Sequence, residues 1–446
     1  MNEERATVRF GEALRFWLKL GFISFGGPAG QIAIMHAELV ERRRWISERR
    51  FLHALNYCML LPGPEAQQLA TYIGWLMHRT WGGIAAGALF VLPSLVILIV
   101  LSWVYIVFGQ TPLVAGIFYG IKPAVTAIVL HAAMRIGSRT LKNGWLAAIA
   151  AASFVAIFAL SVPFPAIVLG AAVFGWLGGR FMPARFESGG AHADTQRSYG
   201  PAWIDDTTPT PAHARFSRLR FVGVVVAGLA LWAMPMGLLW AWLGLQGTYT
   251  QMAWFFTKAA LLTFGGAYAV LPYIYQGAVG TYGWLAPAQM IDGLALGEAT
   301  PGPLIMVVAF IAFVGGWQSP ELVALFGADH RFAAAAIAAC LVTWFTFLPS
   351  FVFILAGGPL VESTHGNLHV SGPLTAITAA VVGVIANLAL FFAYHVFWPQ
   401  GFDGSFDPAA AGLAVAAAVA LIRYRRGVIE TLSACAALGL AVHLLR

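Results

Sequence analysis

Apolar runs, most of them about 20 residues or longer, recur along the whole chain of 446 residues. The hydrocarbon core of a bilayer is roughly 30 Å thick, and a helix needs about 20 residues to cross it. Spanning β-strands would alternate between apolar and polar residues, whereas these runs are uniformly apolar. With 59% hydrophobic and only 10% charged residues, the chain cannot cover itself with polar surface in water. The sequence therefore predicts an all-α polytopic membrane protein.

The apolar segments form three groups of six, one and six. A stretch at residues 183–218 separates the first two groups; it is polar, rich in Pro and Gly and without periodicity, so we expect a flexible cytoplasmic linker. The charged start, MNEERATVRFGEALRF, leads straight into the first apolar segment, so no cleavable signal peptide is expected. We divide the chain into a first repeat (1–182), the linker (183–218), an extra connecting transmembrane helix (219–250) and a second repeat (251–446). The thirteen segments cover residues 10–40, 51–78, 82–108, 112–134, 145–160, 162–180, 219–245, 252–277, 287–317, 331–357, 373–398, 408–422 and 427–445.

The two halves match each other in sequence. At an offset of 239 residues, without a gap, a lysine, a Phe-Gly-Gly, a tryptophan and a Pro-Gly-Pro all recur. Further on, a Leu-Pro-Ser recurs at an offset of 256, so the second half carries an insertion of 17 residues (256 − 239), placed around 315–331. One register held through all these motifs indicates an internal duplication. The matched residues are Lys19 with Lys258, Phe25-Gly26-Gly27 with Phe264-Gly265-Gly266, Trp45 with Trp284, Pro62-Gly63-Pro64 with Pro301-Gly302-Pro303, and Leu92-Pro93-Ser94 with Leu348-Pro349-Ser350.

The odd segment between the repeats makes the second repeat enter the membrane from the opposite side. This predicts two inverted-topology repeats, the architecture of many secondary transporters. Basic residues favour a cytoplasmic N-terminus, because positive loops stay inside. With thirteen simple spans, however, the loop 41–50, ERRRWISERR, would lie outside with its five arginines. If 10–40 and 51–78 are instead re-entrant hairpins, the loop stays inside. Both topologies remain open, and the charges favour hairpins.

Helix breakers lie inside the apolar segments. Gly26-Gly27-Pro28 and Pro62-Gly63-Pro64 would each interrupt a helix, and the second repeat supplies the same pair of breaks. Irregular backbone at membrane depth is tolerated only where protein buries it or where it lines a cavity. Half-helices that start at such breaks expose N–H groups and a positive dipole end, which favour an anion. We therefore expect four half-helix ends to meet near the midplane and to form a binding site.

Two lysines accompany these breaks. Lys19 and Lys258 each lie six residues before a glycine break, and a lysine in a membrane segment usually faces an interior cavity. A symmetric pair of cations beside helix N-termini suggests an anionic substrate. Alternatively, each lysine extends to the membrane interface from near a helix end. Lys122, just before Pro123, is a third intramembrane cation, and its counterpart in the second half is Thr378.

Two carboxylates flank the Pro-Gly-Pro motifs. Glu65 follows the first motif and Glu298 precedes the second, both in apolar surroundings. They could carry protons or pair with the lysines; alternatively, Glu65 only occupies the first turn of a half-helix, where the dipole favours it. Ser24, Gln67, Gln68, Thr263 and Thr300 could donate hydrogen bonds to an oxyanion or join neighbouring helices. His53 and Asp292 also align across the repeats but are weaker candidates, because both lie near segment ends.

The sequence shows no pattern of an enzyme. It has no nucleotide-binding GxxxxGK[ST], no HExxH and no cofactor fingerprint, so no cofactor is expected. Cys58, Cys340 and Cys435 are scattered through apolar segments without metal-binding spacing, so we expect no metal site. The net charge of +7 fits cytoplasmic loops better than binding of nucleic acid. Any active transport would then draw on an ion or substrate gradient.

The duplicated Phe-Gly-Gly, Trp and Pro-Gly-Pro pattern resembles the chromate ion transporter family in its long, two-repeat bacterial form. The stretches LLPGPEAQQLATYIGW and GEATPGPLIMVVAFIAFVGG carry this resemblance, which covers about residues 10–445 apart from the linker. It implies a multi-pass protein of the bacterial inner membrane that exports chromate, a sulfate-like tetrahedral dianion, driven by the membrane potential or a proton gradient. The second repeat departs from the first at Ala267, where the first has Pro28, and at Leu304, where the first has Glu65. The halves are therefore not expected to contribute equally.

The resemblance leaves two other functions open. One is a carrier for sulfate or oxyanions in general, because contacts to oxygen atoms discriminate poorly between chromate and sulfate. The other is an anion channel, which counterflow would distinguish from a carrier. The expected partners are the oxyanion, the lipid bilayer and, as an option, a second copy of the chain in a homodimer. The substrate-binding set predicted from the sequence comprises Lys19, Ser24, Phe25, Gly26, Gly27, Pro28, Pro62, Gly63, Pro64, Gln67, Lys258, Thr263, Phe264, Gly265, Gly266, Thr300, Pro301, Gly302 and Pro303.

Overall fold

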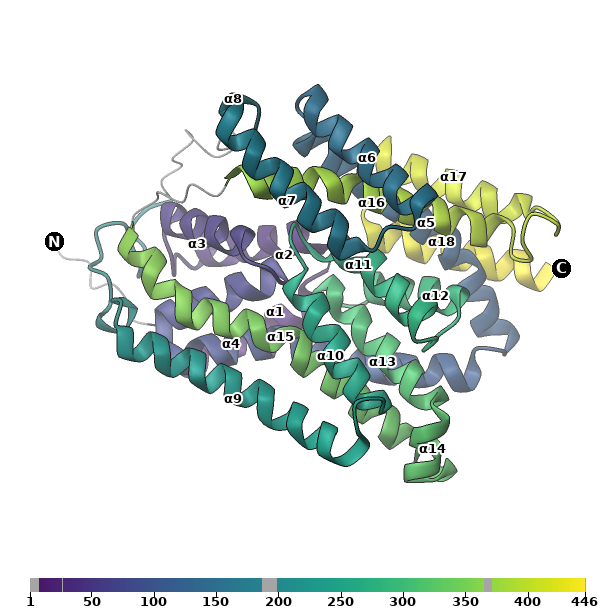
Figure 1. Cartoon of the computed structure of the whole chain (residues 1–446), viewed down its shortest axis with the longest axis horizontal. Coiled ribbons are helices and arrows are strands. Elements are labelled where there is room, and N and C mark those ends of the chain that lie inside the picture. The colour runs from purple at the N-terminus through teal and green to yellow at the C-terminus, as the bar shows by residue number, and fades with distance from the viewer. Residues whose placement is uncertain (1–7, 26, 187–198, 365–370, 446) are drawn as a thin grey trace.

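The structure is a computed structural model that describes residues 8–25, 27–186, 199–364 and 371–445. Most of these residues are helical, and the only β-pairing among them is an isolated bridge between Ile46 and Ile204. Figure 1 shows the helices running mostly along the long axis of the molecule, with the N- and C-termini at opposite ends. The predicted all-α membrane fold is thereby confirmed.

The first repeat begins with two helical hairpins. The apolar segment 10–40 forms a helix, a break and a second helix, and the segment 51–78 does the same around Pro-Gly-Pro. Each arm has only about 13 to 16 residues, or roughly 20–24 Å at 1.5 Å per residue, which is too short to cross a bilayer. Two long helices and a shorter pair follow. The elements are α1 (Phe10–Ile23), α2 (Gly27–His36), η1 (Ala37–Arg42), α3 (Glu48–Leu60), α4 (Glu65–Phe108), α5 (Pro112–Thr140), α6 (Gly144–Leu160), α7 (Phe164–Phe181) and α8 (Pro183–Phe186).

Both hairpins return to the end of the molecule that holds the N-terminus. Non-helical dihedrals at His78 and Arg79 divide α4 into a short first arm and a long second one. The ring of His78 bonds to the carbonyl of Val8, 2.9 Å away, so this kink lies beside the start of the chain. The backbone of Arg44, in the loop between the hairpins, lies beside Trp203 of the linker. The arginine-rich loop 41–50 is therefore on the same side as the N-terminus, as the re-entrant topology requires.

The second half of the linker is packed rather than free. Residues 199–217 run along the first repeat, where the backbone N–H of Trp203 donates to Arg44 and that of Ile204 to Trp45, both at 3.0 Å. Ile204 is buried, and burial, together with the charge of Arg79, lowers the pKa of His213, which bonds to the carbonyl of Trp75. The expectation of a flexible linker over 183–218 therefore fails for 199–217, where apolar side chains anchor the chain; residues 187–198 lie outside the described ranges. Within this stretch η2 covers Ala212–Ala214.

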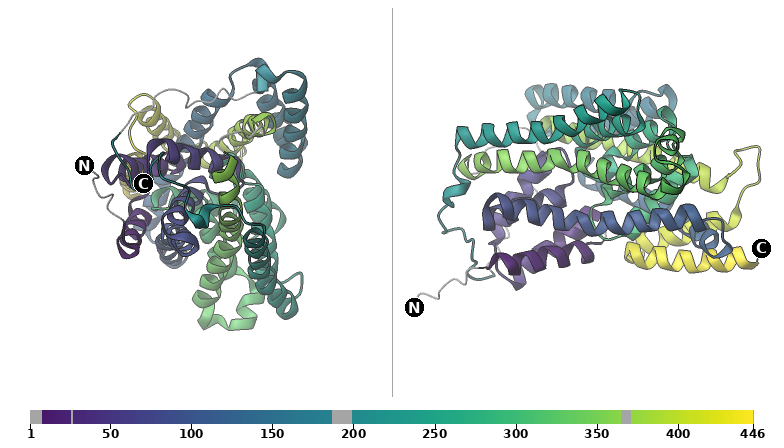
Figure 2. Two further views of the ribbon diagram at one scale, coloured as in Figure 1. Left: turned by 90° about the vertical axis from the view of Figure 1, so that its left-hand side faces the viewer. Right: turned by 90° about the horizontal axis from the view of Figure 1, so that it is seen from below.

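The second repeat repeats the hairpins from the opposite end. Helix α9 (Arg218–Leu243) leads there, exposed over nearly all its length and lying on the outside of the molecule in Figures 1 and 2. Two hairpins follow again, then two long helices and a shorter pair. The elements are α10 (Thr248–Leu261), α11 (Ala267–Tyr275), η3 (Gln276–Thr281), α12 (Pro287–Ala299), η4 (Leu304–Met306), α13 (Val307–Gln318), α14 (Pro320–Phe326), η5 (Ala328–His330), α15 (Arg331–Thr364), α16 (Ser371–Phe397), α17 (Pro408–Ile422) and α18 (Val428–Leu445).

The duplication extends to irregular structure. The π-helices η1 (37–42) and η3 (276–281) lie 239 residues apart at both ends, and so do α3 and α12. The expected insertion around 315–331 coincides with α14 and η5, and α14 is bent by 69° from the helix before it. Because the first repeat enters its centre from the N-terminal end and the second from the opposite end, the repeats are inverted, as predicted.

Seven helices among the described residues are long and apolar enough to cross a membrane, or eight if the bent pair at α13 and α14 counts as one span. The chain therefore has the hairpin topology and not thirteen full crossings. The repeats also exchange parts: α6 and α7 pack on α16 of the other repeat, while α17 and α18 pack on α5. Gly120 lies so close to the carbonyl of Cys435 that α5 and α18 meet backbone to backbone. The seven helices are α4, α5, α7, α9, α15 with its preceding turn, α16 and α18.

Candidate functional site

The breaks of the two repeats are joined by a symmetric pair of hydrogen bonds. The backbone N–H of Gly63 donates to the carbonyl of Thr263, and the N–H of Gly302 donates to the carbonyl of Ser24, both at 2.8 Å. Gly63 and Gly302 are 239 residues apart, and so are Ser24 and Thr263. Each Pro-Gly-Pro turn is therefore bonded to the residue just before the Phe-Gly-Gly motif of the other repeat. The four breaks meet in one place, as the sequence predicted.

Polar side chains surround this meeting point in the interior. The amide nitrogen of Gln31 donates to the carbonyl of Gly302, and that of Gln68 donates to Pro62 at 2.8 Å and to the Ser350 hydroxyl at 3.3 Å. A Cβ on Gly302 would lie only 2.7 Å from Ser94 Cβ, so this serine touches the second turn as Ser350 touches the first. We name these residues the central polar cluster: Ser24, Gln31, Gly63, Gln67, Gln68, Ser94, Thr263, Thr300, Gly302 and Ser350, all buried.

Several polar atoms of the central polar cluster have no hydrogen-bond partner among the described residues: Ser24 Oγ, Ser94 Oγ, and the amide oxygens of Gln31, Gln67 and Gln68. A buried polar atom without a partner costs about 1–3 kcal/mol, so five of them in one place are unusual for a native interior. Hydroxyls can donate as well as accept, and an amide NH₂ carries two N–H donors, of which a bond to one acceptor uses only one. The cluster can therefore offer several donors to one buried anion.

Helix N-termini add positive potential at the same place. Glu65 is the first residue of α4, and Ala267 is the first of α11; the capping residues Pro64 and Gly266 give neither helix a side-chain cap. Uncapped N–H groups at a helix start carry partial positive charge and suit an anion. Gly27 (φ +69°), the first residue of α2, and Gly265 (φ +78°), two residues before α11, hold left-handed backbone within the breaks. The two predicted threonine donors, Thr263 and Thr300, donate to carbonyls of their own helices instead.

The two matched lysines lie outside the central polar cluster. Lys19 is exposed on α1, and Lys258 is half-buried with its ammonium 5.7 Å from the centre of the Trp254 ring. Among the described residues, neither lysine forms a hydrogen bond or ion pair with the cluster. This placement is what lysines reaching toward the membrane interface would show. A role for them in substrate binding remains a proposal that the geometry does not support directly.

The carboxylates occupy different environments in the two repeats. Glu298 is buried and accepts a hydrogen bond from the hydroxyl of Tyr268. Glu65 is half-buried in the first turn of α4, where the helix dipole favours a negative charge. The sequence left open whether these acids carry protons or pair with the lysines, and the structure gives Glu298 a tyrosine partner.

The third predicted cation has a carboxylate partner. The ammonium of Lys122 on α5 lies 3.3 Å from Asp292 Oδ1 on α12, and the hydroxyl of Tyr105 donates to Asp292 Oδ2 at 2.8 Å. Asp292 is buried. Both charged residues stood out in the sequence, but their separation along the chain gave no sign that they pair. His53, which aligns with Asp292 across the repeats, lies on α3.

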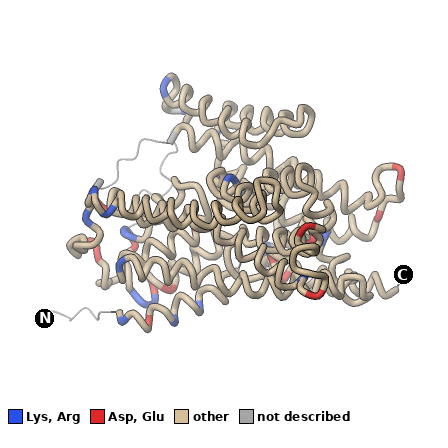
Figure 3. The backbone as a smooth tube through the Cα atoms, turned by 60° about the horizontal axis from the view of Figure 1, so that its bottom comes forward, with Lys and Arg blue, Asp and Glu red and all other residues tan. Residues whose placement is uncertain are grey.

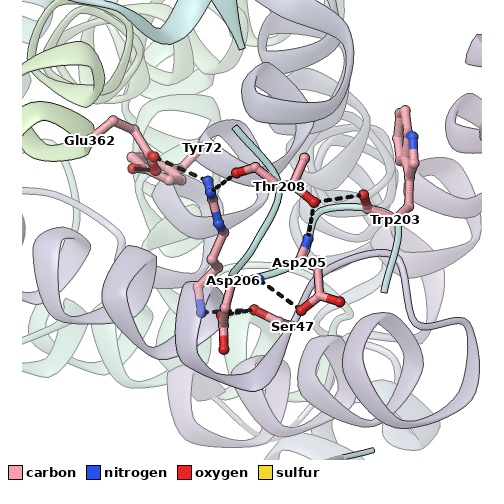
Figure 4. A network of polar contacts seen from close by, with 8 residues as sticks. Ser47, Tyr72, Trp203, Asp205, Asp206, Thr208 and Glu362 are labelled. Atoms are coloured by element: carbon pink, nitrogen blue, oxygen red, sulfur yellow. Dashed lines mark hydrogen bonds and ion pairs between the residues drawn. The ribbon is translucent and has the colours of Figure 1, made fainter. Parts of the chain in front are cut away.

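A second ionic network lies at the N-terminal end of the molecule (Figure 4). The guanidinium of Arg50 lies 3.3 Å from Glu362 Oε2 and donates to the carbonyl of Thr208 at 2.6 Å, while the Tyr72 hydroxyl donates to Glu362 Oε1 at 2.6 Å. Ser47 and Asp206 continue it into the linker, with an Oγ–Oδ1 distance of 2.6 Å. The network therefore joins α3, α4, α15 and the linker, four parts that are distant in sequence.

Most of the predicted set lies at the meeting point of the breaks. Phe25, Pro28, Phe264 and Gly266 belong to the break segments, with Phe25, Pro28 and Phe264 half-buried, while Pro64, Pro301 and Pro303 flank the two glycines in the turns. Gly26 lies outside the described residues. The sequence reasoning missed Gln31, Ser94 and Ser350. The Leu-Pro-Ser match at offset 256 was the signal that could have found the two serines, since it places them symmetrically.

Fold and site together define a membrane protein of two inverted, interlocked repeats around a buried polar centre. The family model described as chromate transporter matches residues 11–176 and 250–440, and so covers both repeats. The chain belongs to the chromate transporter family. A chromate transport protein of Pseudomonas aeruginosa is 32% identical over 83% of this chain and 77% of its own length. One of Cupriavidus metallidurans is 27% identical over 87% of this chain and 83% of its own. No solved structure matches the chain.

Proposed function

We propose that this chain carries chromate out of the cytoplasm and that the oxyanion binds at the central polar cluster. The observation that carries the proposal is the symmetric pair of hydrogen bonds between Gly63 and Thr263 and between Gly302 and Ser24. These bonds bring the breaks of both repeats to one buried place, where five polar atoms lack partners. The names of the relatives, chromate transport proteins, supply the substrate.

Binding a dianion in an apolar interior requires several donors. Leaving water costs an anion far more than it costs an amide, and hydrogen bonds to a charged acceptor are worth about 1.5–3 kcal/mol each. The hydroxyls of Ser24 and Ser94 and the amides of Gln31, Gln67 and Gln68 would supply these bonds, together with N–H groups at the starts of α4 and α11. The inverted repeats would then expose this centre to the two sides in turn.

Energy coupling belongs to the same proposal. Export of a dianion against its gradient would use the membrane potential or a proton gradient, since the sequence has no nucleotide-binding motif. Glu65 and Glu298 are the acids beside the breaks and are proposed to carry protons. Glu298→Gln should then retain exchange of chromate but lose its response to a protonophore. A variant that responds as the wild type does would remove Glu298 from the coupling.

The proposed orientation places the N-terminus, the loop 41–50 and the linker in the cytoplasm of a bacterium, within its inner membrane. Figure 3 shows Lys and Arg gathered mainly at the N-terminal end, whereas Asp and Glu occur at both ends. Positively charged segments remain on the cytoplasmic side. An everted vesicle would therefore present the cytoplasmic face to the medium.

The test is uptake of chromate into everted vesicles that contain the protein, with excess sulfate as competitor and a protonophore as control. We expect uptake that exceeds that of vesicles without the protein and that collapses with the protonophore. Weak competition by sulfate would make chromate the preferred substrate. Absence of chromate uptake, with labelled sulfate moving instead, would replace this proposal by that of a sulfate carrier.

A further inference from the structure

A cavity outside the central polar cluster reaches Lys122. It has a volume of about 630 Å³, and its lining extends from Pro399 and Asp407, in the loop between α16 and α17, to Lys122 on α5 and Asp292 on α12. That loop lies at the end of the molecule opposite the N-terminus (Figure 1). Among the described residues that line this cavity, Lys122 is the one Lys or Arg. A solute that enters from this end therefore meets a single fixed cation.

The repeat symmetry shows how the two ends of the molecule differ. At the N-terminal end, Arg50 forms an ion pair with Glu362. Their counterparts are Gln289, at offset 239, and Ile106, at offset 256. Gln289 and Ile106 both line the cavity, and neither carries a charge. This end therefore lacks the ion pair of the other end and has a cavity at the equivalent positions.

The cation of this cavity is shared with an internal carboxylate. The side chain of Lys122 is 31% exposed and that of Asp292 only 4%, so the ammonium faces the cavity while the carboxylate lies behind it. Asp292 also accepts from Tyr105, which would remain its partner if the lysine turned away. Asp407 is otherwise engaged: it accepts from Tyr119 and caps α17. The exchangeable contact in this cavity is therefore the one between Lys122 and Asp292.

Lys122 also lies within a short distance of the helix breaks, measured along the membrane-spanning direction of the helices. Asp292 precedes Thr300 by eight residues on α12, so about 12 Å of helix separates the ion pair from the central polar cluster. Thr378, the counterpart of Lys122, lies 3.7 Å from where a Cβ on Gly265 would be, directly at a break. Because the repeats are related by inverted symmetry, we expect Lys122 to lie at the same depth in the first repeat as Thr378 does in the second.

We propose that this cavity is a docking site for a dianionic oxyanion, in which the ammonium of Lys122 releases the carboxylate of Asp292 and binds the anion instead. This inference rests on the proposed function and adds a second substrate position on its path. The ammonium offers three donors to a tetrahedral anion of higher charge than a carboxylate. Release of Asp292 leaves a buried carboxylate with fewer partners, which opposes docking and keeps the anion exchangeable.

The test compares Lys122→Met, Asp292→Asn and the double variant, with Lys142→Met as a matched control, because Lys142 is exposed in the turn between α5 and α6 and does not line the cavity. Binding of radiolabelled chromate to purified protein and its flux into proteoliposomes are both measured. Loss of a charge-assisted contact should raise the half-saturating concentration of Lys122→Met about tenfold or more. Asp292→Asn should lower it about tenfold, since the competing anion is gone. The double variant should resemble Lys122→Met.

A purely structural ion pair predicts the opposite pattern. Both single variants would then bind more weakly, and the double variant would recover wild-type behaviour. If Lys122→Met fails to accumulate in the membrane, Asp292→Asn decides alone: tighter binding supports the docking site, and unchanged or weaker binding overturns it. If the wild-type protein neither binds nor transports chromate, the proposed function itself is wrong. If the wild-type protein transports chromate but the variants do not show the predicted changes in affinity, only the docking site is wrong.

Discussion

Single glycines and serines determine where the two repeats meet. Gly63 (φ +125°) and Gly302 (φ +106°) hold backbone conformations that side chains disfavour, and each gives its N–H to the other repeat. The sequence predicted that these breaks would converge, because glycine and proline interrupt an apolar helix and the backbone groups they free must be buried within the protein. It did not predict Gln31 or Ser94, because their roles depend on which way a helix faces.

The turn glycines should not tolerate a side chain. Gly302→Ala would place its Cβ 2.7 Å from Ser94, and Gly63→Ala would place it 2.6 Å from the Gln68 amide, both with positive φ. We expect each variant to lose about 1–3 kcal/mol of stability and most of its transport. Gly11→Ala is the control, because a Cβ there meets nothing within 4 Å. Thermal unfolding and chromate flux are the measurements, and two variants as stable and active as Gly11→Ala would refute the close packing of the turns.

The unpaired serines should separate binding from stability. Ser24→Ala and Ser94→Ala each remove a buried hydroxyl oxygen that has no hydrogen-bond partner, so thermal stability should stay level or rise. The half-saturating chromate concentration should rise about tenfold if that hydroxyl donates to the anion. Ser138→Ala, at an exposed serine, is the control. Reduced stability with unaltered chromate affinity would mean that the serines only pack the interior.

At the scale of elements, hairpins take the place of spans. In the sequence, the positive charge of the loop 41–50 favoured re-entrant hairpins. The structure agrees, because the arms formed by α1, α2, α3 and the start of α4 are all too short to cross a bilayer. The docked part of the linker could not be predicted in the same way. Its composition is that of a free chain, and its contacts come from residues distant in sequence, such as the pairing of Ile204 with Ile46.

The ion pair between Arg50 and Glu362 should stabilise the contact of α3 with α15. Both side chains are largely buried, with 15% and 8% exposure, so Arg50→Met leaves a carboxylate beside Tyr72 without its cation. Breaking one side of such a pair costs about 3–5 kcal/mol. The double variant Arg50→Met/Glu362→Gln should recover much of that loss. Thermal unfolding of the four proteins measures the coupling, and additive losses would show that the two residues act independently.

At the scale of the whole molecule, the repeats are inverted and interlocked, but their ends differ. One end holds the ion pair of Arg50 with Glu362 and the docked linker, while the other holds the cavity at Lys122. The duplication predicted the inversion because an odd segment lies between the repeats. It could not predict the exchange of helix pairs between α5 and α16, because packing partners in a bilayer follow from surface shape and not from apolarity.

Orientation can be tested with single cysteines at the two ends. Arg49→Cys lies at the start of α3, and Ser405→Cys lies in the loop between α16 and α17; both positions are exposed. In a background that lacks the exposed Cys340, an impermeant maleimide added to intact spheroplasts should label Ser405→Cys only. Permeabilised membranes should label both. Labelling of Arg49→Cys from outside would reverse the proposed orientation, since the arginine-rich loop would then face away from the cytoplasm.

The most direct test of the central claim is chromate counterflow in proteoliposomes, with wild-type protein and with Gly302→Val, which blocks the meeting point of the repeats. A carrier with its site at the central polar cluster should take up labelled chromate faster, and with a transient overshoot, when unlabelled chromate is inside. Gly302→Val should lose this exchange. Flux that unlabelled chromate does not accelerate would indicate a channel, and normal counterflow by correctly inserted Gly302→Val would place the binding site elsewhere.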